Sequence, residues 1–339
     1  MTDGASQTWE ARQRGDRPVV PVSCLTPKYA ETEAVMVIYQ NDSIFRLPGN
    51  GESKERCGGW VHPLSCPNYG QPTIEGKQHD RFVVQHSCHS PDCPICYESW
   101  ASREAQRASD RIIQALELYR KAGINFGKVK HVVFSPPQDE AKRLIRTAEG
   151  FRNLKKQAIK IFKKGGVKAG AVIFHPFRQN DPREDNYNPD MPDMIWYLSP
   201  HFHVVGCGYL QKSDEFYDET GWIYNNIGRR ETIKGTIKYT LTHCGIANGF
   251  QALTYFGAFS YNKVVIDEEI KIQEPVQCQV CGEYLHEFAL IEKEESLEPD
   301  WKQDLGVYYH VVIKRTYKLK GLPKTESKVL NLEQRRLLE

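Results

Sequence analysis

The spacing of the cysteines constrains this 339-residue chain more than any other feature of its sequence. The chain holds 10 cysteines, which are too few for a disulfide scaffold of this length. Cys88, Cys93 and Cys96 have the spacing C-x4-C-x2-C. Cys278 and Cys281 have the spacing C-x2-C and are followed by glycine. Outside the secretory pathway such spacings indicate zinc knuckles rather than disulfides.

Each knuckle needs partners from elsewhere in the chain, because a closed structural zinc site takes four ligands. Cys57 and Cys66 can supply thiolates to either cluster. The histidines that we consider as further ligands are His62, His86, His89 and His286. The sequence therefore predicts two zinc sites and leaves the assignment of their remaining ligands open.

The composition is that of a folded protein in water. Hydrophobic residues make up 40% and charged residues 26% of the chain, which excludes the collagen-like, coiled-coil and disordered classes. We find no run of about 18 apolar residues and no leader with charged and then apolar residues. We therefore expect a soluble, cytoplasmic protein with no membrane partner.

Charge is unevenly distributed, although the net charge is only +2. Residues 101–164 carry a net charge of +10 and residues 314–339 a net charge of +5, whereas residues 266–300 carry −9. Any one such run can be a solvated face. Two basic stretches around candidate metal ligands instead favour a phosphate-rich partner, which the acidic region is not expected to contact.

Hydrophobic periodicity and the order of the elements predict an α+β sandwich with helices on one sheet. The predicted helices are 99–121, 139–147, 150–164 and 231–244. The predicted strands are 34–39, 128–135, 168–174, 195–207, 254–265 and 307–317.

These patterns divide the chain into five segments. They are a partly irregular N-terminal extension (1–56), a cysteine-rich zinc-binding segment with its helix (57–123), a core of strands and helices (124–265), an acidic zinc-knuckle insertion (266–300), and a final strand with a basic tail (301–339).

A His-Phe-His sequence lies within the predicted strand 195–207. Strand alternation places His201 and His203 on one face and Phe202 on the other. Two imidazoles about 7 Å apart along one face can converge on a cation, although exposed histidine pairs without a metal are more common. His175 ends the preceding predicted strand and becomes a third ligand if the two strands pair.

Tyr239 and His243 lie one turn apart on the predicted helix 231–244. At about 100° per residue, both point away from the apolar stripe of this helix. That stripe consists of Ile233, Ile237, Leu241 and Cys244. A tyrosine in such a position either faces solvent or presents its hydroxyl to a ligand, and the pattern alone does not decide between them.

Three segments in order, HVVFSPP, SPHFHVVGCG and KGTIKYTLTHCGI, resemble motifs 1, 2 and 3 of the HUH-superfamily rolling-circle replication initiators. The likeness is to initiators of small archaeal and bacterial plasmids and viruses. The upstream CHSPDCPICY resembles the cysteine-rich entry of plasmid initiators. The resemblance covers about residues 57–281. It implies the HUH endonuclease fold, an antiparallel sheet with flanking helices, here with added zinc-binding elements.

The resemblance also implies roles for particular residues. Residues 132–135 would form a core strand. His201 and His203 would hold a divalent cation, Mn²⁺ or Mg²⁺, with His175 as the third ligand. Tyr239 would be the nucleophile.

The third motif departs from the family at one position. Many relatives carry a lysine three residues after the tyrosine, where this chain has Thr242. Tyr261, with Lys263 nearby, is therefore an alternative nucleophile. Proton transfer or positive charge beside Tyr239 would come from His243 or Lys238.

The activity that the resemblance implies is metal-dependent, site-specific nicking and joining of single-stranded DNA through a 5′-phosphotyrosine. This transesterification needs no ATP, and the sequence has no GxxxxGK[ST] loop. Expected partners are single-stranded DNA or an origin hairpin, with a host helicase and polymerase. Alternatives are a mobilisation relaxase, a single-strand transposase, or a non-catalytic zinc-knuckle DNA-binding protein.

Overall fold

Three largely antiparallel sheets and five helices make up the described part of the chain, so the expected α+β class is confirmed. In this computed structural model the described residues are 20–21, 38–39, 41–54, 57–58, 60–71, 73–183, 187–229, 232–291 and 300–320. The helices are α2 (Tyr97–Lys121), α3 (Gln138–Leu144), α4 (Ala148–Lys164), α5 (Ser213–Thr220) and α6 (Ile233–Leu241).

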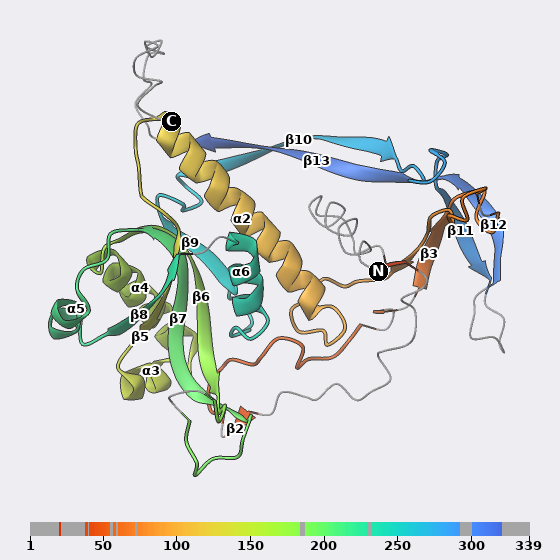
Figure 1. Cartoon of the computed structure of the whole chain (residues 1–339). Helices are drawn as coiled ribbons and strands as arrows, with labels where there is room; N and C mark the ends of the chain where they lie inside the picture. The colour runs from red at the N-terminus through yellow and green to blue at the C-terminus, as the bar shows by residue number, and fades with distance from the viewer. Residues whose placement is uncertain are drawn as a thin grey trace.

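The strands belong to a core sheet, a two-stranded ribbon and a distal sheet (Figure 1). The core sheet contains β2 (Ile38–Tyr39), β5 (Lys130–Ser135), β6 (Val167–Gln179), β7 (Trp196–Gly208), β8 (Ile223–Arg229) and β9 (Leu253–Gly257). The ribbon consists of β10 (Val264–Pro275) and β13 (Tyr309–Leu319). The distal sheet contains β1 (Val20–Pro21), β3 (Trp60–Ser65), β4 (Arg81–Gln85), β11 (His286–Ile291) and β12 (Asp300–Val307).

The core sheet has the order β8-β5-β7-β6-β9 with antiparallel neighbours, and β2 pairs in parallel with the start of β7. Alternation divides the side chains of β7 between two faces. Phe202 and Val204 pack with α3, α4 and α5, whereas Val205 and Cys207 pack with α2 and α6. Helices therefore cover both faces of this sheet (Figure 1).

Local signals explain where two of the helices begin and end. The side chain of Thr147 accepts a hydrogen bond from the Gly150 N–H at 3.0 Å and so caps α4. Helix α2 ends at Lys121, and Gly123 follows with φ +79°, which glycine adopts without strain. Both helices lie where the sequence predicts them.

Two elements between β7 and α6, namely α5 and β8, are not predicted from the sequence. Asn225 and Asn226 in the middle of β8 interrupt its apolar alternation, yet the strand pairs with the whole of β5. The helix predicted over 231–244 is also shorter, because α6 ends at Leu241 and a turn follows.

The strand predicted over 254–265 is in fact two strands, β9 and β10, separated by a turn. Gly257 ends β9 with φ +63°. A Cβ at this position would lie 1.9 Å from the backbone oxygen of Lys168, so glycine is required by both conformation and space.

The turn after β9 is held by the buried Arg111 of α2. Its guanidinium donates hydrogen bonds of 2.7 to 3.1 Å to three backbone oxygens, those of Phe259, Ser260 and Val264. We expect Arg111→Leu to leave these buried oxygens unpaired and to lower the free energy of unfolding by about 2–4 kcal/mol in urea titration. Arg107→Leu, one turn earlier on α2, is the matched control and should change it by less than about 1 kcal/mol.

The described part of the N-terminal segment contains the short strands β1 and β2 and contributes to the core. Phe45 and Leu47 are buried against the face of the sheet that carries α3 and α4. Arg46 pairs with the backbone of Ile246 and places its Nε 2.6 Å from the Asp92 carboxylate. The strand predicted over 34–39 is described only at residues 38–39, and its other residues lie outside the described part.

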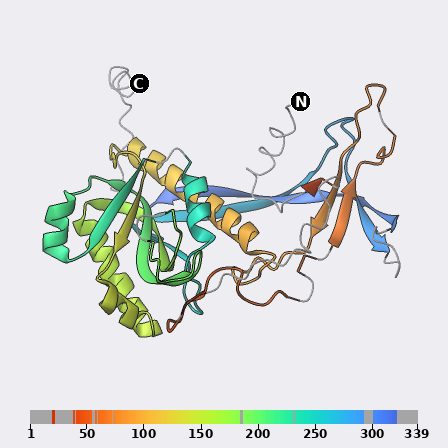
Figure 2. The same ribbon diagram turned by 60° about the horizontal axis from the view of Figure 1, so that its bottom comes forward.

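The ribbon connects the core to a small distal lobe, seen apart from the core in Figure 2. In the lobe β11 pairs with β3 on one side and β12 on the other, so the predicted segments 57–123, 266–300 and 301–339 share one sheet. The buried apolar cluster of the lobe is small among the residues whose side chains are described. It consists of Leu64, Cys66, Cys278 and Leu285.

None of the helices in the described part of the chain is both long enough and apolar enough to cross a membrane.

Candidate functional site

Three histidines meet on the face of the core sheet that carries α2 and α6. Strands β6 and β7 pair with His175 opposite His201, so the pairing on which the third ligand depends is confirmed. One nitrogen from each of His175, His201 and His203 lies within 4.8 Å of the others. The three side chains are buried, and they form a cluster that could hold a metal ion.

Hydrogen bonds fix which nitrogens of this cluster can bind a cation. Nε2 of His175 donates to the Thr240 backbone oxygen at 2.9 Å, which leaves the lone pair on Nδ1. Nδ1 of His201 donates to the Ser199 oxygen at 2.7 Å, which leaves the lone pair on Nε2. Such outward hydrogen bonds are typical of histidines that ligate metals.

Burial keeps the three imidazoles neutral. It lowers the pKa of His175, His201 and His203 well below the usual 6.5, and positive charge on their neighbours lowers it further. A neutral imidazole is the form that ligates metal ions, so the cluster is ready to bind at neutral pH without losing a proton.

A fourth buried histidine, His131 of β5, supports the cluster and was missed in the sequence. Its Nε2 lies 2.7 Å from Nδ1 of His203. When Nδ1 of His203 is the donor of this hydrogen bond, Nε2 of His203 keeps its lone pair for a cation. The signal was present in strand alternation. β5 pairs His131 with Val205, on the same face as His203.

Tyr239 is linked to the histidine cluster by ring contacts that pass through His243. The Tyr239 side chain is 68% exposed, and its ring centroid lies 4.8 Å from that of His243. The His243 ring lies 4.6 Å from His175, edge to face. Burial lowers the pKa of His243 to about 4, so this imidazole is neutral at pH 7 and is a weaker base than an exposed histidine. As predicted, Ile237 and Leu241 face the core instead.

Tyr261 occupies a different environment. Its ring packs against Tyr255 at 5.3 Å and lies under the guanidinium of Arg111 at 4.8 Å. The same guanidinium holds the turn after β9. Among the described residues none of the ring contacts of Tyr261 is with the histidine cluster, whereas the Tyr239 ring contacts His243, whose ring contacts His175.

Arg178 adds a positive charge on the same face of the sheet. A bulge between His175 and Phe177 reverses the alternation of β6, so Phe177 joins the apolar layer and Arg178 lies on the side of the histidines. Its Nε donates to Ser199 Oγ at 3.2 Å, and its Nη2 to Ser135 Oγ at 3.4 Å. Strand alternation in the sequence does not predict this position of Arg178, because the sequence gives no sign of the bulge.

The first knuckle forms a cluster of four thiols that could hold a metal ion. It contains Cys57, Cys88, Cys93 and Cys96. The sulfurs of Cys57 and Cys96 are 3.4 Å apart, well beyond a disulfide bond and close to the edge of about 3.8 Å in a tetrahedron with 2.3 Å Zn–S bonds. Because α2 begins directly after Cys96, the cluster anchors the start of this helix.

The second knuckle is completed by residues far away in the sequence. Cys278 and Cys281 meet Cys66 and His79 in a second cluster that could hold a metal ion. His79 Nδ1 lies 3.7 Å from the sulfurs of both Cys66 and Cys278, near the edge of about 3.6 Å expected for a tetrahedral zinc site. Backbone N–H of Asp80 donates to Cys278 Sγ at 3.4 Å.

None of the four histidines considered as zinc ligands belongs to these clusters within the described residues. His286 instead pairs with Asp304 at 2.7 Å, and His89 with Ser87 at 3.0 Å. His86 is exposed, and the side chain of His62 lies outside the described part. His79, the ligand that was missed, sits in a polar loop without any local spacing signal, so only the tertiary structure assigns it.

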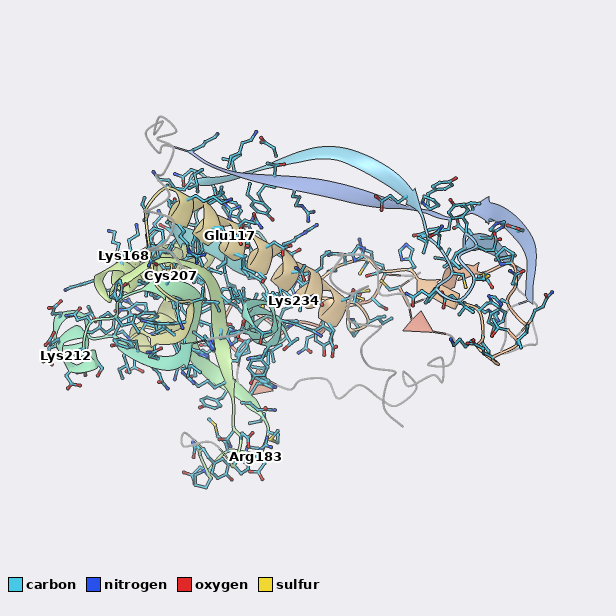
Figure 3. The ribbon with its side chains drawn as sticks, turned by 45° about the horizontal axis from the view of Figure 1, so that its top comes forward. Glu117, Lys168, Arg183, Cys207, Lys212 and Lys234 are labelled. Carbon is cyan, nitrogen blue, oxygen red and sulfur yellow. The ribbon has the colours of Figure 1, made fainter. Side chains whose placement is uncertain are left out.

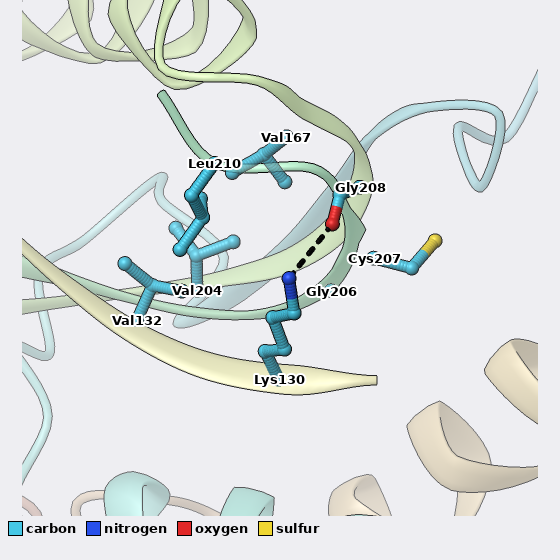
Figure 4. Close-up of a pocket in the computed structure, with 8 residues that line it drawn as sticks. All are labelled: Lys130, Val132, Val167, Val204, Gly206, Cys207, Gly208 and Leu210. Atoms are coloured by element: carbon cyan, nitrogen blue, oxygen red, sulfur yellow. Dashed lines mark hydrogen bonds between the residues drawn. The ribbon is translucent and has the colours of Figure 1, made fainter. Parts of the chain in front are cut away.

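A small pocket lies at the other end of β7 from the histidines (Figure 4). Its lining is largely aliphatic, and Lys130 Nζ donates to the Gly208 oxygen across it at 3.0 Å. Lys130 therefore ties β5 to β7, and we assign no ligand to this pocket.

No protein-family model, curated protein or solved structure matches this chain. Its function must therefore be inferred from the site itself.

Proposed function

We propose that this protein is an HUH-type rolling-circle replication initiator that nicks and rejoins single-stranded DNA. One observation carries the proposal: an unbroken run of ring contacts leads from the exposed Tyr239 through His243 to the buried histidine cluster. A phenol beside a candidate cation site is what phosphodiester transesterification requires. The antiparallel core sheet with helices on both faces fits the HUH fold that the sequence motifs imply.

In the proposed reaction the Tyr239 oxygen attacks a phosphorus of the DNA backbone. A bond forms between the phenol oxygen and phosphorus, and the bond from phosphorus to the 3′ oxygen breaks. The phenol proton passes to the neutral His243, and the departing 3′ oxygen takes up a proton to become a hydroxyl. The number of phosphoester bonds is unchanged, so the reverse reaction rejoins the strand without ATP.

The residues that would hold the divalent cation are His175, His201 and His203, with His131 orienting His203. Mn²⁺ bound there, or Mg²⁺ at its higher cellular abundance, would supply Lewis-acid polarisation of the phosphate. We assign Zn²⁺ to the two cysteine clusters, where thiolates favour it and four ligands close each site. The partners implied are single-stranded DNA or an origin hairpin and a host helicase and polymerase, in the cytoplasm.

The proposal is tested by covalent capture. The protein is incubated with Mn²⁺ and random-sequence single-stranded oligonucleotides labelled at their 3′ ends, and then denatured. We expect the label to stay with the protein, because the 5′ phosphate of the downstream fragment becomes attached to tyrosine. Cleavage without attachment would instead indicate a metal-dependent hydrolase, and binding alone the non-catalytic DNA-binding alternative.

Brief treatment with EDTA is expected to abolish the adduct, and added Mn²⁺ to restore it. The histidine cluster supplies three neutral ligands. Each cysteine cluster supplies four ligands, at least three of which are thiols, and such a set holds zinc more tightly. Metal analysis of the treated protein should therefore still find zinc. Loss of zinc and adduct at the same EDTA concentration would contradict two separate types of site.

A further inference from the structure

Arg178 poses an electrostatic problem if the histidine cluster holds a cation. The two positive groups would lie on one face of the sheet and share Ser199 as a partner, since Oγ of Ser199 accepts from Arg178 and its backbone oxygen accepts from Nδ1 of His201. Like charges in such a partly buried place repel strongly. An anion between them turns this repulsion into two attractions, since it interacts favourably with both.

The groups around Arg178 are suited to binding that anion. Ser199 Oγ and Ser135 Oγ each accept a hydrogen bond from the guanidinium, so each hydroxyl still has its own hydrogen to donate. The three side chains come from three adjacent strands, β6, β7 and β5, which hold them rigidly. All three are partly exposed, whereas the neighbouring histidines are buried. A guanidinium braced in this way matches the oxygens of a phosphate.

We propose that Arg178, Ser135 and Ser199 form a phosphate-binding subsite for the DNA backbone beside the histidine cluster. This inference rests on the proposed function, since it places a phosphate of the strand that Tyr239 attacks between Arg178 and the cation site. Arg178 there is a substrate-contacting residue, and it fixes the register of the strand on the sheet.

The subsite is tested by salt dependence of binding. Binding of a fluorescein-labelled oligothymidine to the Mn²⁺-loaded Tyr239→Phe protein is measured by anisotropy over a range of salt concentrations. Arg178→Gln should weaken binding about tenfold and lower the slope of log K against log salt by about 0.7 for each phosphate that the protein no longer neutralises. Arg178→Lys should restore most of that slope, because it keeps the charge.

Arg183→Gln is the matched control. Arg183 lies in the connection between β6 and β7, away from the helices in Figure 3, and pairs with Asp181 at 2.6 Å. The Arg183→Gln substitution removes the same charge a few residues away from Arg178. It should leave both the affinity for oligothymidine and the slope of log K against log salt unchanged. Melting temperatures of all variants establish that they fold. An unchanged slope in folded Arg178→Gln, or an equal fall in Arg183→Gln, would overturn the subsite.

A second arm separates this inference from the proposed function. If the wild-type protein forms an adduct, Arg178→Gln should raise KM and lower the rate of adduct formation. A substrate with an uncharged methylphosphonate next to the phosphate that becomes joined to tyrosine should form the adduct more slowly with the wild-type protein. The same substrate should not slow adduct formation by Arg178→Gln any further. An adduct rate in Arg178→Gln equal to that of the wild-type refutes the subsite alone. If the wild-type forms no adduct, the proposed function fails and the salt slope still decides whether Arg178 binds phosphate.

Discussion

Tyr239→Phe is expected to abolish the covalent adduct with DNA, lowering its rate by more than about a thousandfold. The substitution removes one oxygen atom from a side chain that is 68% exposed, so folding should be unaffected. Binding of the oligonucleotide should remain, because the histidine cluster and Arg178 are intact. The measurement is retention of the 3′ label on the denatured protein, beside binding by anisotropy.

Tyr261→Phe provides the matched control and also tests the alternative nucleophile. Its ring lies against Tyr255 and Arg111, and removal of the hydroxyl leaves both ring interactions in place. We expect the adduct to form at close to the wild-type rate. The opposite pattern, with the adduct absent in Tyr261→Phe and kept in Tyr239→Phe, would transfer the role of nucleophile to Tyr261 and remove the reason for placing His243 in the reaction.

His79→Ala is expected to unfold the distal lobe and to reduce bound zinc from two ions per chain to one. Among the described residues, the apolar cluster of the lobe has four buried members, and two of them are the candidate ligands Cys66 and Cys278. So small a core does not offset the entropy of ordering its strands. Structural zinc contributes about 10–16 kcal/mol of apparent binding energy in small zinc domains, so the metal decides whether the lobe folds.

Amide hydrogen exchange locates this effect. In His79→Ala, β3, β4 and β11 should lose protection, while β5, β6 and β7 keep theirs, because the core has two large apolar layers of its own. His286→Ala is the control, since His286 lies in the same lobe and pairs with Asp304. It should keep both zinc ions and full protection. Two zinc ions and normal exchange in His79→Ala would show that this histidine is no ligand.

The arrangement of the two metal types suggests a division of labour under the proposed function. The four-thiol cluster precedes α2, whose Arg111 holds the turn that begins the ribbon. The cluster with His79 closes the far lobe. Zinc would therefore support the structure at two places, the start of α2 and the lobe at the far end of the ribbon. The histidine cluster would serve the chemistry.

Local sequence was sufficient wherever a feature depends on neighbouring residues. Strand alternation placed His201 and His203 on one face, and helical periodicity turned Tyr239 away from the apolar stripe of its helix. The spacing of the knuckles predicted the two cysteine clusters. In each case the backbone geometry of one helix, strand or turn fixes the relation between the residues, so no distant contact is needed to read it.

Only the tertiary structure decided which distant segments meet. His79 joins Cys278 across about 200 residues of sequence because β3 pairs with β4 on one side and with β11 on the other. A bulge in β6 turns Arg178 toward the histidines, against the alternation that the sequence suggests. Strand register, bulges and the docking of one sheet against another arise from the packing of the whole chain, and no local pattern of residues records them.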